Sequence, residues 1–329
     1  MKEVKKLKRG KMESKEKTPN GIRKFFYIFV LVLTILLLSY YIYKNFTDFS
    51  QIRIVNPFSL ILLVIIFISD FYLLALFTKF LLVPFNVQIS TKEAFGLSVL
   101  TRFYNLISIF RGGTLAKAVY LKKKYKLSYT EYIANMSALY IIIFLVGSFS
   151  GLASMLLLRY YSGIFNSIIF LLFLGTFICL LAITIFSPKL PDIKNRWLGK
   201  FVIVINSWHE IRKDKKIILL TVLVSFAQLI LSALGTIVVY NIFGVNVEFT
   251  KAIFIVSLSS LSIVIAITPG NLGIGDAVSI FSANIMGIAL NHAVAAAILL
   301  RIINIIGIII LTPIFSYSLM KELSNEKSH

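Results

Sequence analysis

The chain has 329 residues, of which 58% are hydrophobic, with a mean hydropathy of +0.88 and a formal net charge of +20. This composition excludes an ordinary soluble domain, because several apolar runs reach the roughly 20 residues that a helix needs to cross a bilayer. The charge does not favour nucleic-acid binding, since the basic residues gather in the N-terminal tail and a few loops, as positive cytoplasmic loops do in membrane proteins. The only cysteine, Cys179, excludes an intrachain disulfide.

The N-terminal part of the chain predicts a tail followed by two membrane spans. Residues 1–24 are polar and rich in lysine, which is typical of a disordered cytoplasmic tail. The apolar run 25–43 is longer than the roughly 7–15-residue core of a signal peptide and ends in bulky tyrosines, so we expect a retained anchor. The second span, 57–80, carries Asp70 near its centre. An acid at that depth is costly unless it is paired or wetted, so Asp70 indicates either a substrate path or a pair with a neighbouring helix.

The next segment predicts a hairpin that enters and leaves the membrane on one side. Residues 94–110 are apolar apart from a few polar groups such as Arg102, whereas residues 111–126 are strongly basic. If the first part crossed the bilayer, the basic part would lie outside, against the positive-inside rule. A re-entrant hairpin open to the cytoplasm removes this conflict, with Gly112-Gly113 as its turn or helix break.

A basic face follows these glycines. Arg111, Thr114 and Lys117 are spaced i, i+3 and i+6, so a helix places them roughly on one side. This face is either an anion grip for a phosphate, with arginine as a planar fork and lysine as a point charge, or an edge helix with solvated charges. Further lysines predict a patch against anionic headgroups at the cytoplasmic face: Lys122, Lys123, Lys124 and Lys126.

The chain after residue 126 contains four more predicted spans and a second interruption. The spans are 133–158, 164–186, 217–243 and 292–316. The stretch Thr268–Asp276 has one proline and three glycines between two apolar runs. Proline removes a backbone donor and glycine makes it easier to leave the helix, so the chain breaks here. Because non-helical backbone at membrane depth must be covered by protein or line a wet cavity, we expect a second re-entrant hairpin with a transport site at its tip.

Together these elements predict an all-α polytopic membrane protein with about six full transmembrane helices and two oppositely oriented re-entrant hairpins. The opposite orientations are what an inverted repeat produces. The expected organisation is a basic tail (1–24), one membrane domain (25–318) and a polar tail (319–329). We expect the protein in the cell membrane, with both termini in the cytoplasm, because this places each basic loop inside.

The same residues carry a family resemblance. The motifs are Arg111-Gly112-Gly113-x-Leu115-x-Lys117-Ala118, then Pro269-Gly270-Asn271-Leu272-Gly273-x-x-Asp276-Ala277, then Ala295-Ala296-Ala297 leading to Arg301. They resemble the membrane region of the lysylphosphatidylglycerol synthase family over most of residues 20–318. The resemblance implies a lipid flippase domain that moves anionic or aminoacylated phospholipids, or polyprenyl-linked carriers, between leaflets. The soluble aminoacyl-transferase domain of the full synthases is absent from this sequence, so we expect no lysine transfer.

The resemblance and the polar groups around the motifs together predict a site for a lipid headgroup. Its candidate residues are Arg111, Gly112, Gly113, Lys117, Pro269, Gly270, Asn271, Gly273, Asp276 and Arg301, with Asp70, Arg102 and Thr114 as secondary candidates. Arg111, Lys117 and Arg301 would contact the phosphate, and the half-helix that begins near Gly275 would direct its positive end toward it. Asp276 is interpreted either as a helix cap without a functional role or as a partner of Arg301 that responds to a cationic headgroup.

Two other functional classes remain open. A membrane-embedded polyprenyl-phosphate glycosyltransferase needs acids that hold a metal or act as a base, and the sequence contains no Asp-x-Asp and only scattered histidines. The third class is an accessory subunit of a cell-envelope glycan or lipid pathway. We expect no catalysis, metal or cofactor. The expected partners are a membrane phospholipid or polyprenyl-linked lipid and anionic headgroups at the cytoplasmic face, without nucleic acid.

Overall fold

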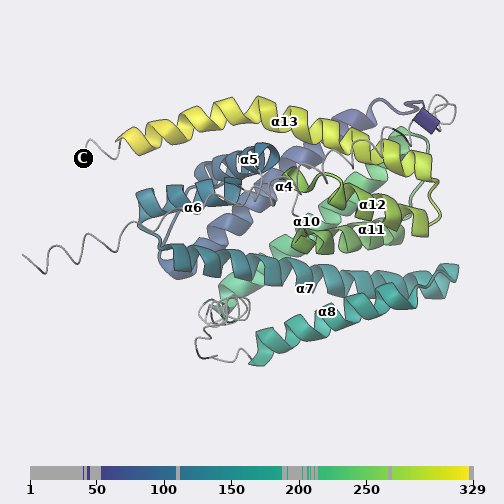
Figure 1. Cartoon of the computed structure of the whole chain (residues 1–329), viewed down its shortest axis with the longest axis horizontal. Helices are drawn as coiled ribbons and strands as arrows, with labels where there is room; N and C mark the ends of the chain where they lie inside the picture. The colour runs from purple at the N-terminus through teal and green to yellow at the C-terminus, as the bar shows by residue number, and fades with distance from the viewer. Residues whose placement is uncertain are drawn as a thin grey trace, which may run out of the picture.

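The structure is a computed structural model that describes most of the membrane region. The described residues are 40, 43–44, 53–108, 112–186, 191, 202, 206, 208, 211, 214–265 and 269–325. Over these ranges the chain forms helices and no strand, which confirms the predicted all-α class (Figure 1). The tail 1–24, nearly all of the predicted anchor 25–43 and most of the loop 187–216 lie outside the described residues.

Five of the described helices are long and apolar enough to cross a membrane. They are α4 (Ser59–Leu82), α7 (Tyr129–Ser162), α8 (Ser167–Phe186), α10 (Lys215–Ile242) and α13 (Leu290–Asn325). They correspond to five of the six predicted spans, and the sixth is the anchor outside the described residues. Helix α13 continues beyond the predicted span end at residue 316, so the segment assigned to the C-terminal tail begins as helix.

Two pairs of shorter helices lie between the long ones. The first pair is α5 (Thr91–Ile107) and α6 (Gly112–Tyr125), and the second is α11 (Phe249–Leu261) and α12 (Ile274–Ile285). A side-chain cap marks the start of α5, where Ser90 Oγ accepts a hydrogen bond from the backbone N–H of Glu93. Between α11 and α12 only short 3₁₀ turns are described, which confirms the break predicted from the proline and glycines.

The order of elements occurs twice, as α4–α5–α6–α7 and as α10–α11–α12–α13. Helices α4 and α10 pack side by side in opposite directions. The Val55 N–H, just before α4, donates to the Ile242 carbonyl at the end of α10 (2.8 Å), and Asn56 Nδ2 donates to Asn241 Oδ1 (3.1 Å). Helix α5 packs against α13, and its counterpart α11 packs against α7. Exchanging the two halves therefore preserves the pattern of contacts, as an inverted repeat requires.

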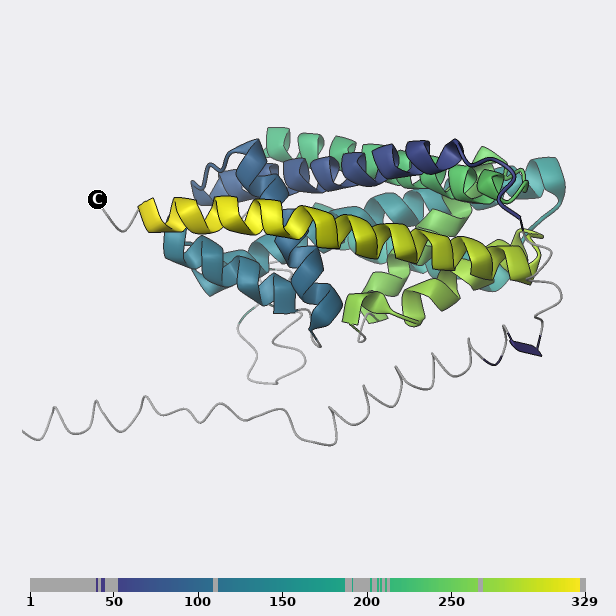
Figure 2. The same ribbon diagram turned by 90° about the horizontal axis from the view of Figure 1, so that it is seen from above.

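The two hairpins lie toward opposite ends of the bundle. Figures 1 and 2 show α5 and α6 beside the C-terminal half of α13, whereas α12 lies beside its N-terminal half. The second hairpin packs against α8 within the largest buried apolar cluster. There the ring of Phe254 in α11 packs edge to face on the ring of Phe173 in α8, with the ring centroids 6.2 Å apart. The hairpins thus converge on the middle of the molecule from its two ends.

Candidate functional site

The tips of the two hairpins touch near the centre of the bundle. A Cβ added at Gly270 would lie 3.1 Å from Leu106 Cδ1 and 3.6 Å from Leu106 Cα, in the last turn of α5. Gly270 also has a φ of +59°, and Asn271 follows with +58°. Glycine adopts this left-handed conformation freely, and asparagine tolerates it. The turn conformation and the close contact therefore both favour glycine at position 270.

An ion pair fastens the second tip to α13. Arg301 Nη2 donates to both carboxylate oxygens of Asp276 (2.8 and 2.7 Å), and its Nη1 donates to the Gly270 carbonyl (2.9 Å). Asp276 Oδ2 in turn accepts the backbone N–H of Gly273 (3.1 Å) at the start of α12. One carboxylate therefore both caps the half-helix and pairs with Arg301, whereas a response of this pair to a cationic headgroup stays a prediction.

Asn271 fills the space inside this tip. Its Nδ2 donates to Ser262 Oγ (3.3 Å), whereas its Oδ1 is buried without a hydrogen-bond partner among the described groups. A Cβ on Gly275 would lie only 2.4 Å from Asn271 Nδ2, so the glycine makes room for the amide. The structure thus brings together the predicted residues of the second motif, from Pro269 to Asp276, with Arg301.

The two glycines of the first hairpin lie at the predicted helix break and also have a packing role. Helix α5 ends at Ile107, and Gly112 and Gly113 are the first residues of α6. A Cβ on Gly113 would lie 1.9 Å from the Thr101 carbonyl oxygen, so these residues let α6 pack closely on α5. Asn105 Oδ1 accepts the backbone N–H groups of Gly113 (3.0 Å) and Thr114 (3.3 Å) and caps the helix. Arg111 lies outside the described residues.

Lys117 does not join the second tip. Its side chain is buried, and its Nζ donates to Thr78 Oγ1 of α4 at 2.8 Å. Thr114 lies one turn earlier on α6 and is partly exposed. The described part of the predicted basic face therefore connects α6 to α4 and forms no cluster with Arg301.

Replacing Thr78 by valine tests this connection. We expect Thr78→Val to cost about 1–3 kcal/mol of stability, because it leaves a buried ammonium group without its acceptor. The matched control is Thr221→Val, since Thr221 is equally buried and its hydroxyl bonds only to carbonyls of its own helix. Thermal unfolding in detergent measures both variants, and equal shifts would contradict the role assigned to Thr78.

One lysine in the lysine-rich last turn of α6 contacts a buried acid of α5. Glu93 of α5 is buried and accepts hydrogen bonds from the phenols of Tyr120 (2.9 Å) and Tyr125 (2.7 Å), and Lys124 Nζ lies 3.2 Å from its Oε1. Burial and the nearby carboxylate raise the pKa of both phenols, so they remain protonated donors. Lys124 thus holds the hairpin together instead of standing free for anionic headgroups.

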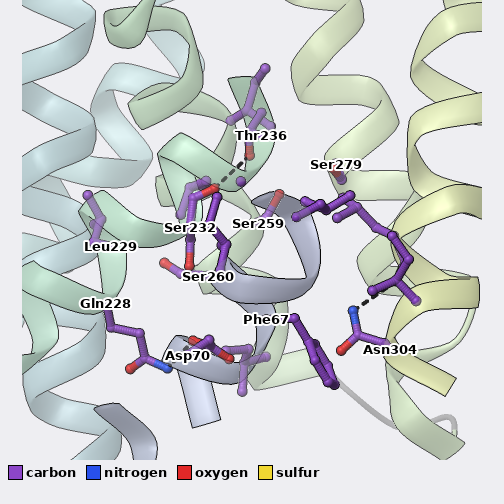
Figure 3. A pocket seen from close by; sticks show the side chains of 18 of the residues that line it. Phe67, Asp70, Gln228, Leu229, Ser232, Thr236, Ser259, Ser260, Ser279 and Asn304 are labelled. Carbon is purple, nitrogen blue, oxygen red and sulfur yellow. Dashed lines mark hydrogen bonds between the residues drawn. The ribbon is translucent and has the colours of Figure 1, made fainter. Parts of the chain in front are cut away.

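A cavity of about 400 Å³ lies between α4, α10, α11, α12 and α13, with one lining residue each from α5 and α7 (Figure 3). Its wall is largely apolar but receives polar side chains from several helices: Asp70, Arg102, Ser225, Gln228, Ser232, Thr236, Ser259, Ser260, Ser279 and Asn304. Two secondary candidates, Asp70 and Arg102, line it, whereas the described primary candidates do not. Sequence reasoning missed the other eight, although the polar positions of α10 at 225, 228, 232 and 236 follow helical spacing on one face.

The acid and the arginine in the cavity wall form a second ion pair. Arg102 Nη2 donates to Asp70 Oδ2 at 2.5 Å, and Gln228 Nε2 donates to Asp70 Oδ1 at 2.9 Å. The Arg102 guanidinium also lies 4.4 Å from the centroid of the Phe71 ring. Both interpretations of Asp70 are compatible with this geometry, since it pairs with a neighbouring helix and also faces the cavity.

The two ion pairs flank the same hollow. Ser279 follows Asp276 by three residues and Asn304 follows Arg301 by three, so each lies one turn further along the same helix face. The pair at the second tip is therefore one helical turn from the cavity wall. Within the described residues, no group of three His, Cys, Asp or Glu side chains is arranged to hold a metal.

Comparison with protein families gives one match. The family model described as "Lysylphosphatidylglycerol synthase TM region" matches residues 23–312, which include both hairpins and the cavity. No curated protein and no solved structure matches the chain.

Proposed function

The chain belongs to the family of the lysylphosphatidylglycerol synthase TM region and is an integral membrane protein of lipid metabolism or transport, and on that basis we propose that it is a flippase-like lipid transporter. It moves a phospholipid or a polyprenyl-phosphate-linked lipid between the leaflets of the cell membrane. The headgroup passes through the cavity, while the acyl or prenyl chains stay in the surrounding lipid. The protein itself catalyses no bond chemistry.

The observation that carries this proposal is the polar cavity beside a broken helix. An acid and an arginine within apolar helices are costly in a bilayer, and such residues usually mark a substrate path. In transporters with repeated halves, interrupted helices meet at the substrate site. Here the hairpin tips meet at Gly270 and Leu106, and the Asp70–Arg102 pair faces the cavity.

We infer that both hairpins are re-entrant. Helices α5, α6, α11 and α12 have 17, 14, 13 and 12 residues, fewer than the roughly 20 needed to cross a bilayer. They approach from opposite ends of the bundle, which supports entry from opposite membrane faces. The lysines at the end of α6 favour the cytoplasm for the first hairpin, and hence for both chain termini.

The ion pairs suggest how access could alternate. Arg102 connects α5 to α4, and Arg301 connects the second tip to α12 and α13, so each pair holds one hairpin closed. A headgroup oxygen that bonds to an arginine competes with its carboxylate and weakens that closure. Since a ligand shifts an equilibrium only through a difference in affinity, binding would favour opening on one side at a time.

Lipid movement in proteoliposomes tests the proposal. We expect Asp70→Asn to slow the transfer of fluorescent lipid about tenfold, because a charge-assisted hydrogen bond is worth about 1.5 kcal/mol or more. Asp214→Asn is the matched control, because Asp214 caps α10 away from the cavity and asparagine caps equally well. Native rates in a folded Asp70→Asn protein would rule out the cavity as the path. Sugar transfer by the purified protein would contradict the absence of catalysis.

A further inference from the structure

The polar part of the cavity wall consists mainly of hydroxyl groups. Six of the lining residues carry one, from three different helices: Ser225, Ser232, Thr236, Ser259, Ser260 and Ser279. Two amides, Gln228 and Asn304, complete the neutral polar set. Figure 3 shows most of these side chains around one hollow, with Gln228 beside Asp70 and Asn304 on the opposite wall. A hydroxyl both donates and accepts hydrogen bonds, so this wall suits a ligand that does the same.

The charges in the wall cancel. Asp70 and Arg102 are the charged side chains among the described lining residues, and they pair with each other. Both oxygens of Asp70 are occupied, one by Arg102 and one by Gln228. The neighbouring pair at the second tip is balanced in the same way. A headgroup carrying a full charge would therefore enter without a compensating charge, which is unfavourable in a low-dielectric site.

Several wall groups still have hydrogen-bonding capacity. Ser259 Oγ is buried without a hydrogen-bond partner among the described residues. Asn304 uses its Nδ2 on the Leu300 carbonyl, which leaves its Oδ1 to accept. Thr236 and Ser260 donate to backbone carbonyls of their own helices, so their oxygens are also acceptors. A site with such groups discriminates strongly against ligands that cannot satisfy them.

We propose that the group held in this cavity is an uncharged polyhydroxyl headgroup, either a glycosyl or a glycerol group, on the lipid that the protein moves. This inference rests on the proposed function and specifies its substrate class. The cavity of about 400 Å³ is near the lower end of the ~300–1,000 Å³ range of small-molecule pockets, so it holds one small headgroup rather than a long glycan. A lipid phosphate remains outside the hydroxyl-lined part.

A panel of fluorescent lipids in proteoliposomes tests the proposal with the native chain. The lipids share their acyl chains and carry a phosphoglycosyl group, a phosphoglycerol group or a bare phosphate. We expect the first two to move at least about tenfold faster than phosphatidic acid, because only their hydroxyls can satisfy the hydrogen-bonding groups of the wall. The faster of the two identifies whether the hydroxyls come from a sugar or from glycerol.

A variant with fewer cavity hydroxyls provides the second measurement. Ser232→Ala combined with Ser260→Ala should slow the hydroxyl-bearing lipids and leave phosphatidic acid nearly unchanged. The control is Ser148→Ala with Ser154→Ala, since these buried serines of α7 bond to their own helix and do not line the cavity. Preferential movement of phosphatidic acid would overturn this inference and leave the transport function standing. No movement of any lipid would overturn the transport function and this inference with it.

Discussion

Asp276→Asn is expected to be less stable than the native protein by about 2–3 kcal/mol and to move lipid more slowly. Asparagine can still accept the Gly273 N–H, but it leaves the Arg301 guanidinium without its counter-charge. Arg301 and Asp276 are only 23% and 24% exposed, so water replaces little of the lost interaction. The Gly270 carbonyl alone would then hold the tip to α13. Thermal unfolding in detergent measures the loss of stability, and the proteoliposome assay measures transport.

A double variant measures the interaction between Asp276 and Arg301 apart from the effect of removing one charge alone. Asp276→Asn with Arg301→Gln removes both charges, so it should recover part of the stability that Asp276→Asn loses, as a double-mutant cycle reports for coupled residues. Glu248→Gln is the exposed control. Its carboxylate pairs with Lys251 at 3.2 Å but is 63% exposed, so its loss should cost less than about 0.5 kcal/mol. If the two single acid-to-amide variants lose equal stability, the Asp276–Arg301 pair does not hold the tip.

The long helices and the second break could be predicted because their signals are local. Hydropathy over about 20 residues marks a span, and the proline and glycines between 269 and 275 interrupt a helix wherever they occur. The pairing of α5 with α13 and of α11 with α7 depends on contacts between distant segments. An inverted repeat could be inferred from the opposite predicted orientations of the two hairpins, although the sequence similarity between the halves is limited to short matches such as Lys117-Ala118-Val119 and Asp276-Ala277-Val278.

The places where the structure differs from the predicted site have physical causes. The contact of Lys117 with Thr78 is not visible in the sequence, because Thr78 lies 39 residues earlier and on another helix. The cavity serines of α10 and α11 were missed because serine and threonine lower hydropathy little, and in apolar helices they commonly bond to their own backbone. The pair of Asp276 with Arg301 is one of the two alternatives that the sequence leaves open, and the structure contains it, as is usual for charged residues within a membrane.

Glycine has two different roles in this fold, and the sequence does not distinguish them. Gly270 has a positive φ and lies in a turn, as its neighbours proline and asparagine suggest. Gly112 and Gly113 have no positive φ, and they start a helix that lies against another backbone. A pair of glycines has the same signature in both situations, because a sequence does not reveal which atoms approach the missing side chain.

Gly113→Ala is the sharpest test of that close approach. The added methyl group would lie 1.9 Å from the Thr101 carbonyl oxygen and 2.9 Å from Asn105 Oδ1, so α6 must move away from α5. Backbone cannot rotate aside as a side chain can, and we expect a loss of about 3 kcal/mol or more. The displacement would also break the cap that Asn105 gives to α6, so lipid transport should fall together with the melting temperature.

Gly175→Ala is the matched control for this substitution. Gly175 lies inside α8, where an added Cβ meets nothing within 4 Å. Alanine favours a helix over glycine by about 1 kcal/mol, so this variant should be as stable as the native protein or more stable. The same methyl group is thus predicted to have opposite effects at two helical glycines. Equal melting temperatures for the two variants would mean that α5 and α6 are not packed backbone to backbone, and the position of the first hairpin tip against Gly270 would then lose its support.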